Sequence, residues 1–227
     1  METQFKQIAA LIGDPVRATI MWTLSEGKAF TATELAFAAE TSPQNISMHL
    51  SKLVQAGLLN VERQGRHRYY ALSRKEIAYA IEAMANLIPH ATIKNNHTIE
   101  TNPVTYCRTC YDHLAGKVGV AITENLLQQK IIIDRNNSFE IRGNGKKWFA
   151  ELGIDVDELK LQRRSLLRPC LDWSERRHHM AGSVAASLLD KMISFDWIRK
   201  TKNSRAMIIT GKGQKNLHEY FKISVPQ

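Results

Sequence analysis

The stretch TSPQNISMHLSKLVQAGLL, residues 41–59, decides the fold of the first part of the chain. Pro43 follows Ser42 and suits the first turn of a helix that begins after a tight turn. Apolar residues then recur at the spacing of one buried helical face, at Ile46, Leu50, Leu53 and Val54. Most other positions carry short polar groups or methionine, which suit contacts with base edges in DNA. We predict that bases face Gln44, Asn45, Ser47, Met48, His49, Ser51 and Lys52.

Three helical segments are expected before this stretch. Apolar spacing predicts one helix that ends at Gly13-Asp14-Pro15 and a second over 16–24 that Gly27 closes. A short third helix over 34–40 is expected to have Thr33 as its N-cap. Only a tight turn separates the third helix from the one that begins at Pro43. Two helices joined in this way, the second polar on its outer face, are typical of a helix-turn-helix.

A basic hairpin is expected directly after the helix-turn-helix. The residues LLNVERQGRHRYYALS, 58–73, alternate like two strands around a turn at Gln64-Gly65. Its tip carries four basic residues: Arg63, Arg66, His67 and Arg68. A hairpin in this position is a wing, and its cations suit contacts with phosphates or with the minor groove.

The residues above resemble a known family, the ArsR/SmtB winged-helix repressors, over residues 4–90. The resemblance is carried by DPVRATIMWTL (14–24), by 41–59 and by RQGRHRYYALS (63–73). Its most specific part is the run S-x-H-L-x-x-L-x-x-A-G-L that begins at Ser47. The resemblance implies a homodimer whose two recognition helices enter successive major grooves of double-stranded DNA. It also implies that the wing supports them through Arg66, His67 and Arg68.

The metal sites that the resemblance implies for many family members are absent from this sequence. One uses a cysteine pair in the helix before the recognition helix, but residues 34–41 contain no cysteine. The other uses His and Asp on the last helix, where residues 74–90 offer only His90. The expected helix 74–89 instead has an apolar seam, suited to pairing with a twin or to covering the core: Ile77, Ile81, Met84 and Ile88. A regulatory site of this protein is therefore expected elsewhere in the chain, unless the protein is regulated only through its abundance.

The composition is that of an ordinary globular protein. The chain has 227 residues, 44% hydrophobic and 23% charged, with no apolar run long enough for a membrane span. Three cysteines and the absence of a secretory signal indicate a reducing cytoplasm. The net charge of +9 suggests an anionic partner, and residues 93–227 contribute +8 of it.

Two domains are expected, joined by a polar linker at 93–103. They are a DNA-binding domain over 1–92 and a C-terminal domain over 104–227. The second repeats itself, since residues 113–138 and 179–204 are identical at seven of 26 aligned positions. We predict two duplicated helix–hairpin–helix lobes that resemble degenerate winged helices. The expected fold class is α+β, mainly α-helical with small β-hairpins.

Each copy opens with a similar signature, CYDHLAG at 110–116 and CLDWSERRHHMAG at 170–182. We expect the small Ala-Gly pairs to let two long helices cross closely, which would bring both signatures together. Cys110 and His113 are three residues apart, so we expect them on one helical face, with Cys107 one turn back. Thiolates and imidazoles suit zinc or another thiophilic metal. The predicted ligand set is Cys107, Cys110, Asp112, His113, Cys170, Asp172 and His179.

Several roles stay open for this doubled signature: core packing, metal or thiol sensing, and binding of an organic ligand. A redox form would join Cys110 to Cys170. A thiol-dependent enzyme is an alternative, but no nucleophile loop or Gly-rich phosphate loop accompanies either cysteine, so we expect no enzyme. A DNA-binding protein without an effector is another. The favoured interpretation is a cytoplasmic, homodimeric, sequence-specific repressor, released when a metal, thiol-reactive or small-molecule effector binds the C-terminal domain.

Overall fold

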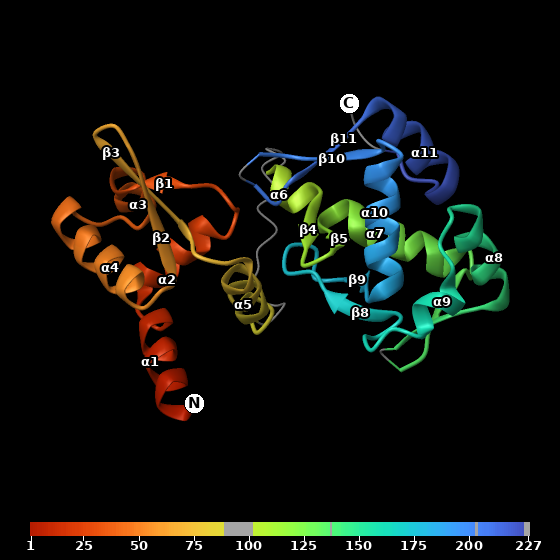
Figure 1. Ribbon diagram of the computed structural model, residues 1–227, viewed down its shortest axis with the longest axis horizontal. Helices are drawn as coiled ribbons and strands as arrows, with labels where there is room; N and C mark the ends of the chain where they lie inside the picture. The colour runs from red at the N-terminus through yellow and green to blue at the C-terminus, as the bar shows by residue number, and fades with distance from the viewer. Residues whose placement is uncertain (89–101, 137, 203, 225–227) are drawn as a thin grey trace. The chain divides into compact units, whose positions relative to one another are not determined.

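The computed structural model describes residues 1–88, 102–136, 138–202 and 204–224. The chain forms two compact units, Met1–Ala85 and Asn86–Gln227, called unit 1 and unit 2 below (Figure 1). Most of the predicted linker 93–103 lies outside the described residues, as does His90. Within the described ranges, no helix combines the length and apolar character that crossing a membrane requires.

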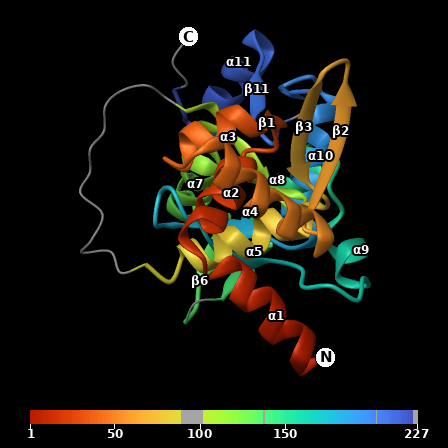
Figure 2. The same cartoon turned by 90° about the vertical axis from the view of Figure 1, so that its left-hand side faces the viewer.

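Unit 1 contains five helices and one small sheet in its described residues (Figures 1 and 2). The helices are α1 (Glu2–Ile12), α2 (Pro15–Leu24), α3 (Ala32–Ala38), α4 (Pro43–Gln55) and α5 (Lys75–Ala85). The strands are β1 (Phe30–Thr31), β2 (Leu59–Gln64) and β3 (His67–Leu72), and they pair antiparallel in the order β1-β3-β2. The pair α3 and α4 forms the helix-turn-helix, and β2 and β3 form the wing. Unit 1 is therefore a winged helix-turn-helix.

Side-chain caps fix where the helices of unit 1 begin. The carboxylate of Asp14 caps α2 by accepting a hydrogen bond from the backbone N–H of Arg17, at 3.0 Å. Thr31 caps α3 in a capping box with Glu34. The predicted N-cap Thr33 is wrong, because β1 ends at Thr31 and the chain turns into α3 directly after it, which leaves Thr33 inside the first turn.

The core of unit 1 gathers the buried faces of α2, α3, α4 and α5. Its buried residues are Ile20, Met21, Leu24, Leu35, Ala36, Ile46, Leu50, Leu53, Leu58, Leu59, Ile77 and Ile81. The last helix ends at Ala85, earlier than the predicted 89. Of the predicted apolar seam, Ile77 and Ile81 join this core, whereas Met84 and Ile88 are exposed. The seam therefore covers the core with its first half only.

In its described residues, unit 2 contains four β-hairpins interleaved with helices. Its helices are α6 (Pro103–Tyr106), α7 (Gly116–Gln128), α8 (Gly143–Glu151), α9 (Val156–Lys160), α10 (Ser183–Ser194) and α11 (Gly211–Phe221). Its strands are β4 (Arg108–Cys110), β5 (His113–Ala115), β6 (Ile132–Asp134), β7 (Phe139–Ile141), β8 (Arg168–Leu171), β9 (His178–Ala181), β10 (Ile198–Lys200) and β11 (Met207–Ile209). The order hairpin, helix, hairpin, helix occurs twice, with α9 between the two runs.

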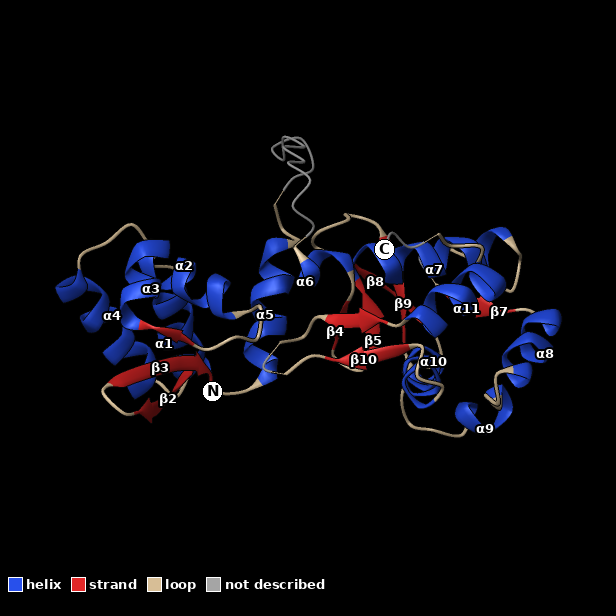
Figure 3. Cartoon of the chain, turned by 90° about the horizontal axis from the view of Figure 1, so that it is seen from above, coloured by secondary structure: helices blue, strands red, loops and turns tan. Residues whose placement is uncertain are grey.

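The two halves of unit 2 interlock rather than sit apart. Hairpins β4–β5 and β8–β9 lie side by side, as Figure 3 shows. The helix that follows each hairpin packs against the other hairpin, α7 against β9 and α10 against β5. One continuous core joins the halves, with Val118 and Ile122 of α7 and Val184 and Leu188 of α10 buried in it. Unit 2 therefore folds as one body in which both signature hairpins are held at its centre.

The Ala-Gly pairs serve a different purpose from the one predicted. Gly116 and Gly182 adopt left-handed φ angles of 76° and 107° at the hairpin-to-helix turns. A Cβ at Gly116 would lie 2.6 Å from the carbonyl oxygen of Thr105, and one at Gly182 would lie 2.7 Å from that of Ser165. The prediction of a helix crossing at these pairs is wrong, because each glycine instead meets the backbone just before its own hairpin.

Candidate DNA interface and candidate metal centre

The outer face of α4 presents polar side chains to solvent. Ser42 caps the helix by accepting a hydrogen bond from the backbone N–H of Asn45, at 3.2 Å. Asn45 is half-buried, and its side-chain amide donates to Thr41 Oγ1 at 2.7 Å. The other predicted base-facing residues are exposed, with one exception treated next: Gln44, Ser47, Met48, Ser51 and Lys52.

His49 does not belong to this surface. Its side chain is buried, with Nδ1 3.3 Å from Asp14 Oδ1 and 3.5 Å from a guanidinium nitrogen of Arg17. The prediction that His49 faces bases is therefore wrong, and the side chain instead ties α4 to the start of α2. The signal was present in the sequence, because His49 is three residues after Ile46 and four before Leu53, on the apolar face.

The wing presents its basic residues freely. Arg63 pairs with Arg68 across the β2–β3 hairpin, and Gly65 makes the turn with a φ of 58°. Arg63, Arg66, His67 and Arg68 are all exposed. None of these four forms an ion pair with a carboxylate among the residues that the structure describes. Their charge therefore remains available for an anionic partner such as a phosphate backbone.

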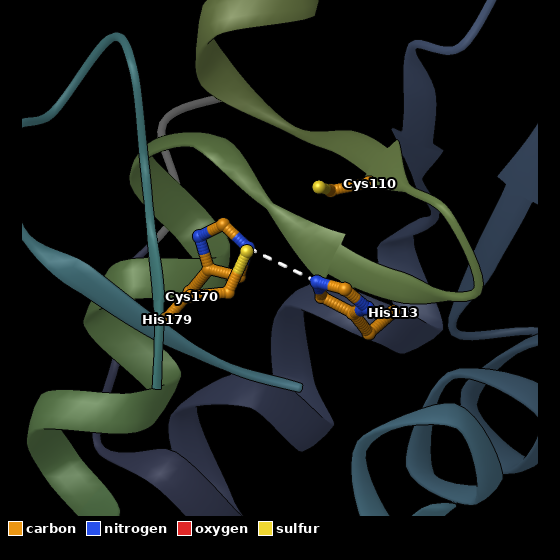
Figure 4. Close-up of side chains that lie close together, drawn as sticks. All are labelled: Cys110, His113, Cys170 and His179. Carbon is orange, nitrogen blue, oxygen red and sulfur yellow. Dashed lines mark hydrogen bonds between the residues drawn. The ribbon is translucent and has the colours of Figure 1, made fainter. Parts of the chain in front are cut away.

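Hairpins β4–β5 and β8–β9 bring two cysteines and two histidines together in unit 2 (Figure 4). Cys110 lies opposite His113 in the first hairpin, and Cys170 lies opposite His179 in the second. Directly opposite residues of an antiparallel pair point to the same face of the sheet, so each hairpin supplies one thiol and one imidazole. One ligand atom from each of the four lies within 4.8 Å of every other. We call these four residues the tetrad.

The sheet geometry corrects the prediction of a helical face. Cys110 and His113 flank a two-residue turn at Tyr111 and Asp112, where Tyr111 has a φ of 57°. Cys107 lies at the end of α6, fully buried in the hydrophobic core rather than in the tetrad. Burial raises the pKa of the Cys107 thiol to about 12, although the charge of Arg108 opposes this. The inclusion of Cys107 in the ligand set is therefore wrong.

The two predicted aspartates lie behind the histidines of the tetrad. Asp112 Oδ1 is 3.3 Å from His113 Nδ1, and Asp172 Oδ2 is 3.2 Å from His179 Nδ1. Asp112 is about half exposed and also pairs with Arg164 at 2.6 Å. Asp112 hydrogen-bonds the ring of His113, whereas Asp172 lies within ion-pair distance of His179 without a hydrogen bond to Nδ1, and neither aspartate joins the tetrad. The two Nε2 atoms, turned away from the carboxylates, face each other at 3.2 Å.

The electrostatics of the tetrad favour a thiolate and polarised imidazoles. Hydrogen bonding by Cys110 lowers the pKa of the Cys170 thiol far below its usual value against the effect of burial, and His113 and His179 act in the same direction. Burial alone would lower the pKa of His179, but Asp172 and Cys170 outweigh it and raise that pKa. Burial alone would raise the pKa of Asp172, but His179 and Arg108 hold it well below its usual value.

A buried arginine completes this centre, and the sequence reasoning missed it. Arg108 is 1% exposed, donates to Asp172 Oδ2 at 3.0 Å and to the carbonyl of Val104 at 3.2 Å. Its guanidinium lies 4.8 Å from the centre of the Trp173 ring. A signal existed, because an arginine stands two residues before the cysteine in both signatures, Arg108 and Arg168. Only the first is buried.

Unit 1, with its exposed polar helix and free basic wing, defines a winged helix-turn-helix DNA-binding domain. A family model described as a helix-turn-helix domain matches residues 12–62. The whole chain is similar to YdfF, an HTH-type transcriptional regulator of Bacillus subtilis (strain 168), with 37% identity over 226 residues, 99% of this chain and 100% of YdfF. The chain therefore belongs to this family of HTH-type transcriptional regulators. The prediction of such a regulator is confirmed.

Solved structures are similar over a smaller share of the chain. HlyU from Vibrio cholerae N16961 is 24% identical, with a TM-score of 0.35, and the match covers 38% of this chain and 92% of HlyU. The transcriptional repressor BigR from Xylella fastidiosa is 22% identical, with a TM-score of 0.36, over 39% of this chain and 89% of BigR.

Proposed function

We propose that this protein is a sequence-specific repressor that binds double-stranded DNA as a homodimer and responds to an effector bound by unit 2. The observation that carries the proposal is the combination of an exposed polar face on α4 with a wing whose cations form no ion pair with an acidic residue in the described part of the chain. Side chains of such a helix can read base edges, and wing cations can bind phosphates.

The exposure of helix α1 favours a second copy of the chain as the partner of unit 1. No residue of α1 is buried, and Phe5 is 70% exposed. An 11-residue helix is marginal in water unless its apolar face is covered. Ile8, Leu11 and Ile12 pack partly against the core of unit 1, and a partner would cover Phe5 as well. In a homodimer two α4 helices read two half-sites related by the twofold axis of the protein.

We infer that unit 2 is an internal duplication of a helix–hairpin–helix lobe that resembles a degenerate winged helix. The repeated element order supports this, and so does a repeated close contact. Gly145 lies in the first turn of α8, and Gly213 lies in the first turn of α11. A Cβ at Gly145 would overlap the carbonyl oxygen of Ile131, and a Cβ at Gly213 would overlap that of Trp197. Equivalent glycines against equivalent carbonyls favour a common origin. The effector site is proposed where the two lobes contribute the tetrad.

The salt dependence of DNA binding tests the role of the wing without knowledge of the operator. The double variant Arg66→Ala with Arg68→Ala is expected to weaken binding to random-sequence duplex, measured by fluorescence anisotropy. The slope of log K against log salt should flatten by about 2 for each protomer that contacts DNA, because fewer counterions are released.

The matched control removes the same charge from hairpins of unit 2. Arg135 and Arg199 are exposed hairpin arginines already paired with Glu140 and Asp196. The double variant Arg135→Ala with Arg199→Ala should leave the slope unchanged. Equal slopes for all three proteins would contradict the assignment of the wing to the DNA backbone.

Selection of binding sites from random duplexes tests the homodimer and the repressor's specificity. A homodimer is expected to enrich a twofold-symmetric site, with half-site centres about 10–10.5 base pairs apart or a multiple of that. Enrichment of a single asymmetric half-site, with a monomer in sedimentation, would overturn the proposed dimer.

A further inference from the structure

The ligand atoms of the tetrad lie close enough together for one metal ion to bind all four after a small inward movement. In a tetrahedral zinc site with Zn–N bonds of about 2.0–2.1 Å, two nitrogen ligands lie about 3.3–3.4 Å apart. The two Nε2 atoms are 3.2 Å apart, and all four ligand atoms fall within 4.8 Å of one another. The space between them therefore suits one ion, not a cluster.

The carboxylates behind the rings select the nitrogens that would bind metal. Asp112 lies beside Nδ1 of His113, and Asp172 lies beside Nδ1 of His179. An imidazole that keeps its proton on Nδ1 next to a carboxylate presents a bare lone pair on Nε2. Two such lone pairs facing each other repel unless a proton or a cation lies between them.

Burial and ligand count point to a closed site. His113 and His179 are each 1% exposed and Cys110 is 8% exposed, whereas Cys170 is half-buried. Two thiolates with two imidazoles in tetrahedral arrangement favour zinc over metals that prefer oxygen ligands or square-planar geometry. With four protein ligands no coordination position remains for a substrate, as in structural zinc sites.

We propose that Cys110, His113, Cys170 and His179 bind one Zn(II) ion tetrahedrally, through both thiolates and both Nε2 atoms, with Asp112 and Asp172 orienting the rings. The ion joins hairpin β4–β5 to hairpin β8–β9 and so cross-links the two halves of unit 2. Binding releases the protons that the thiols and the Nε2 atoms hold in the metal-free protein, and no oxidant or reductant takes part. This inference rests on the site proposed above for the effector and names Zn(II) as the ion bound there, but it does not depend on DNA binding.

Metal analysis of the full-length wild-type protein, purified in reductant without added metal, is the first test. We expect one zinc per chain by mass spectrometry, removed by chelation. Reconstitution with Co(II) should then give the strong visible absorption of tetrahedral Co(II) and a thiolate charge-transfer band. Neither measurement requires DNA, so failure here is separate from failure of the proposed repressor function.

Variants then assign the ligands. Cys110→Ser and His179→Ala should lose both the zinc and the Co(II) bands. The matched controls are the neighbouring exposed His178→Ala and the core Cys107→Ala, which should keep both. Because a ligand variant could fail to fold, His179→Cys provides a rescue, since a three-cysteine, one-histidine set still binds zinc.

Three results would overturn the proposal. One is wild-type protein without stoichiometric zinc and without Co(II) bands after reconstitution. Another is loss of metal in His178→Ala or Cys107→Ala to the same extent as in the ligand variants. The third is a Cys110–Cys170 disulfide that persists in freshly purified protein despite the reductant, which would assign the pair to redox chemistry instead.

Discussion

Replacing Asp172 by asparagine is expected to destabilise unit 2 far more than the same change at Asp112. The carboxylate of Asp172 is fully buried and accepts hydrogen bonds on both oxygens. Oδ2 receives the backbone N–H of Gly116 at 2.7 Å and Arg108 at 3.0 Å. Oδ1 receives the backbone N–H and the hydroxyl of Ser174 at 2.9 and 2.7 Å. An amide nitrogen at either position would therefore face donors.

The expected loss of stability in each variant follows from how deeply the arginine partner of the aspartate is buried. Asp172→Asn removes the charge opposite Arg108, which stays 1% exposed, and breaking a buried ion pair in this way costs about 3–5 kcal/mol. Asp112 pairs with Arg164 at the surface, with side chains 46% and 43% exposed, so Asp112→Asn should cost less than about 1 kcal/mol. The two variants thus give a matched comparison of equivalent positions in the two signatures.

Urea unfolding, monitored by tryptophan fluorescence, measures the loss of unfolding free energy in both variants. Trp148, Trp173 and Trp197 lie in unit 2, so a Trp22→Phe background leaves the signal to that unit. Excess chelator in every sample removes any contribution from metal. Equal losses in the two variants, or a loss below about 1 kcal/mol for Asp172→Asn, would refute the reasoning from buried charge.

Three further predictions concern helix caps, close packing and metal. Asp14→Ala should destabilise unit 1 by about 1 kcal/mol in urea unfolding. Hydrogen bonding to the Arg17 N–H lowers the pKa of Asp14, so this contribution is full above the unfolded pKa of about 3.9 and disappears as the pH falls through the lower folded value. Gly213→Ala should cost about 1–3 kcal/mol because its Cβ meets the Trp197 carbonyl, whereas Gly211→Ala, with open space, should not destabilise. Chelation should lower the thermal unfolding midpoint of unit 2 and leave that of unit 1 unchanged. Tryptophan fluorescence monitors the unfolding of unit 2, and circular dichroism monitors both units. An equal shift in unit 1 would count against a site confined to unit 2.

Unit 1 could be predicted from the sequence because its signals are local. The apolar spacing of Ile46, Leu50 and Leu53 fixes the buried face of α4, and the Gln64-Gly65 turn fixes the wing. The misassignments at His49 and Thr33 have local causes too. His49 is a polar residue on the apolar face that pairs with the half-buried Asp14 at the start of α2, and composition alone does not reveal that partner.

The tetrad was harder to predict because its spacing is ambiguous. Cys110 and His113 are three positions apart, which fits one turn of a helix and equally fits the two ends of a two-residue hairpin turn. Such turns usually carry Asn or Gly at positive φ, and here Tyr111 occupies that position without a sequence signal. The pairing of Cys170 with His179, nine residues later in the chain, depends on strand register and has no local signature at all.

The two signatures differ in how deeply they bury their aspartates, and the cause is the six additional residues that precede His179 in the second signature. They lengthen the β8–β9 loop, and Asp172 organises that loop by accepting from the backbone N–H groups of Ser174 and Glu175 at 2.9 and 3.1 Å. A carboxylate held in this way points inward, where Arg108 of the other hairpin can reach it. Asp112 sits in a two-residue turn that offers no such cradle, so it remains near the surface with Arg164. The longer loop therefore provides a buried cross-link between the hairpins that does not depend on metal, and the tetrad can be assembled before an ion arrives.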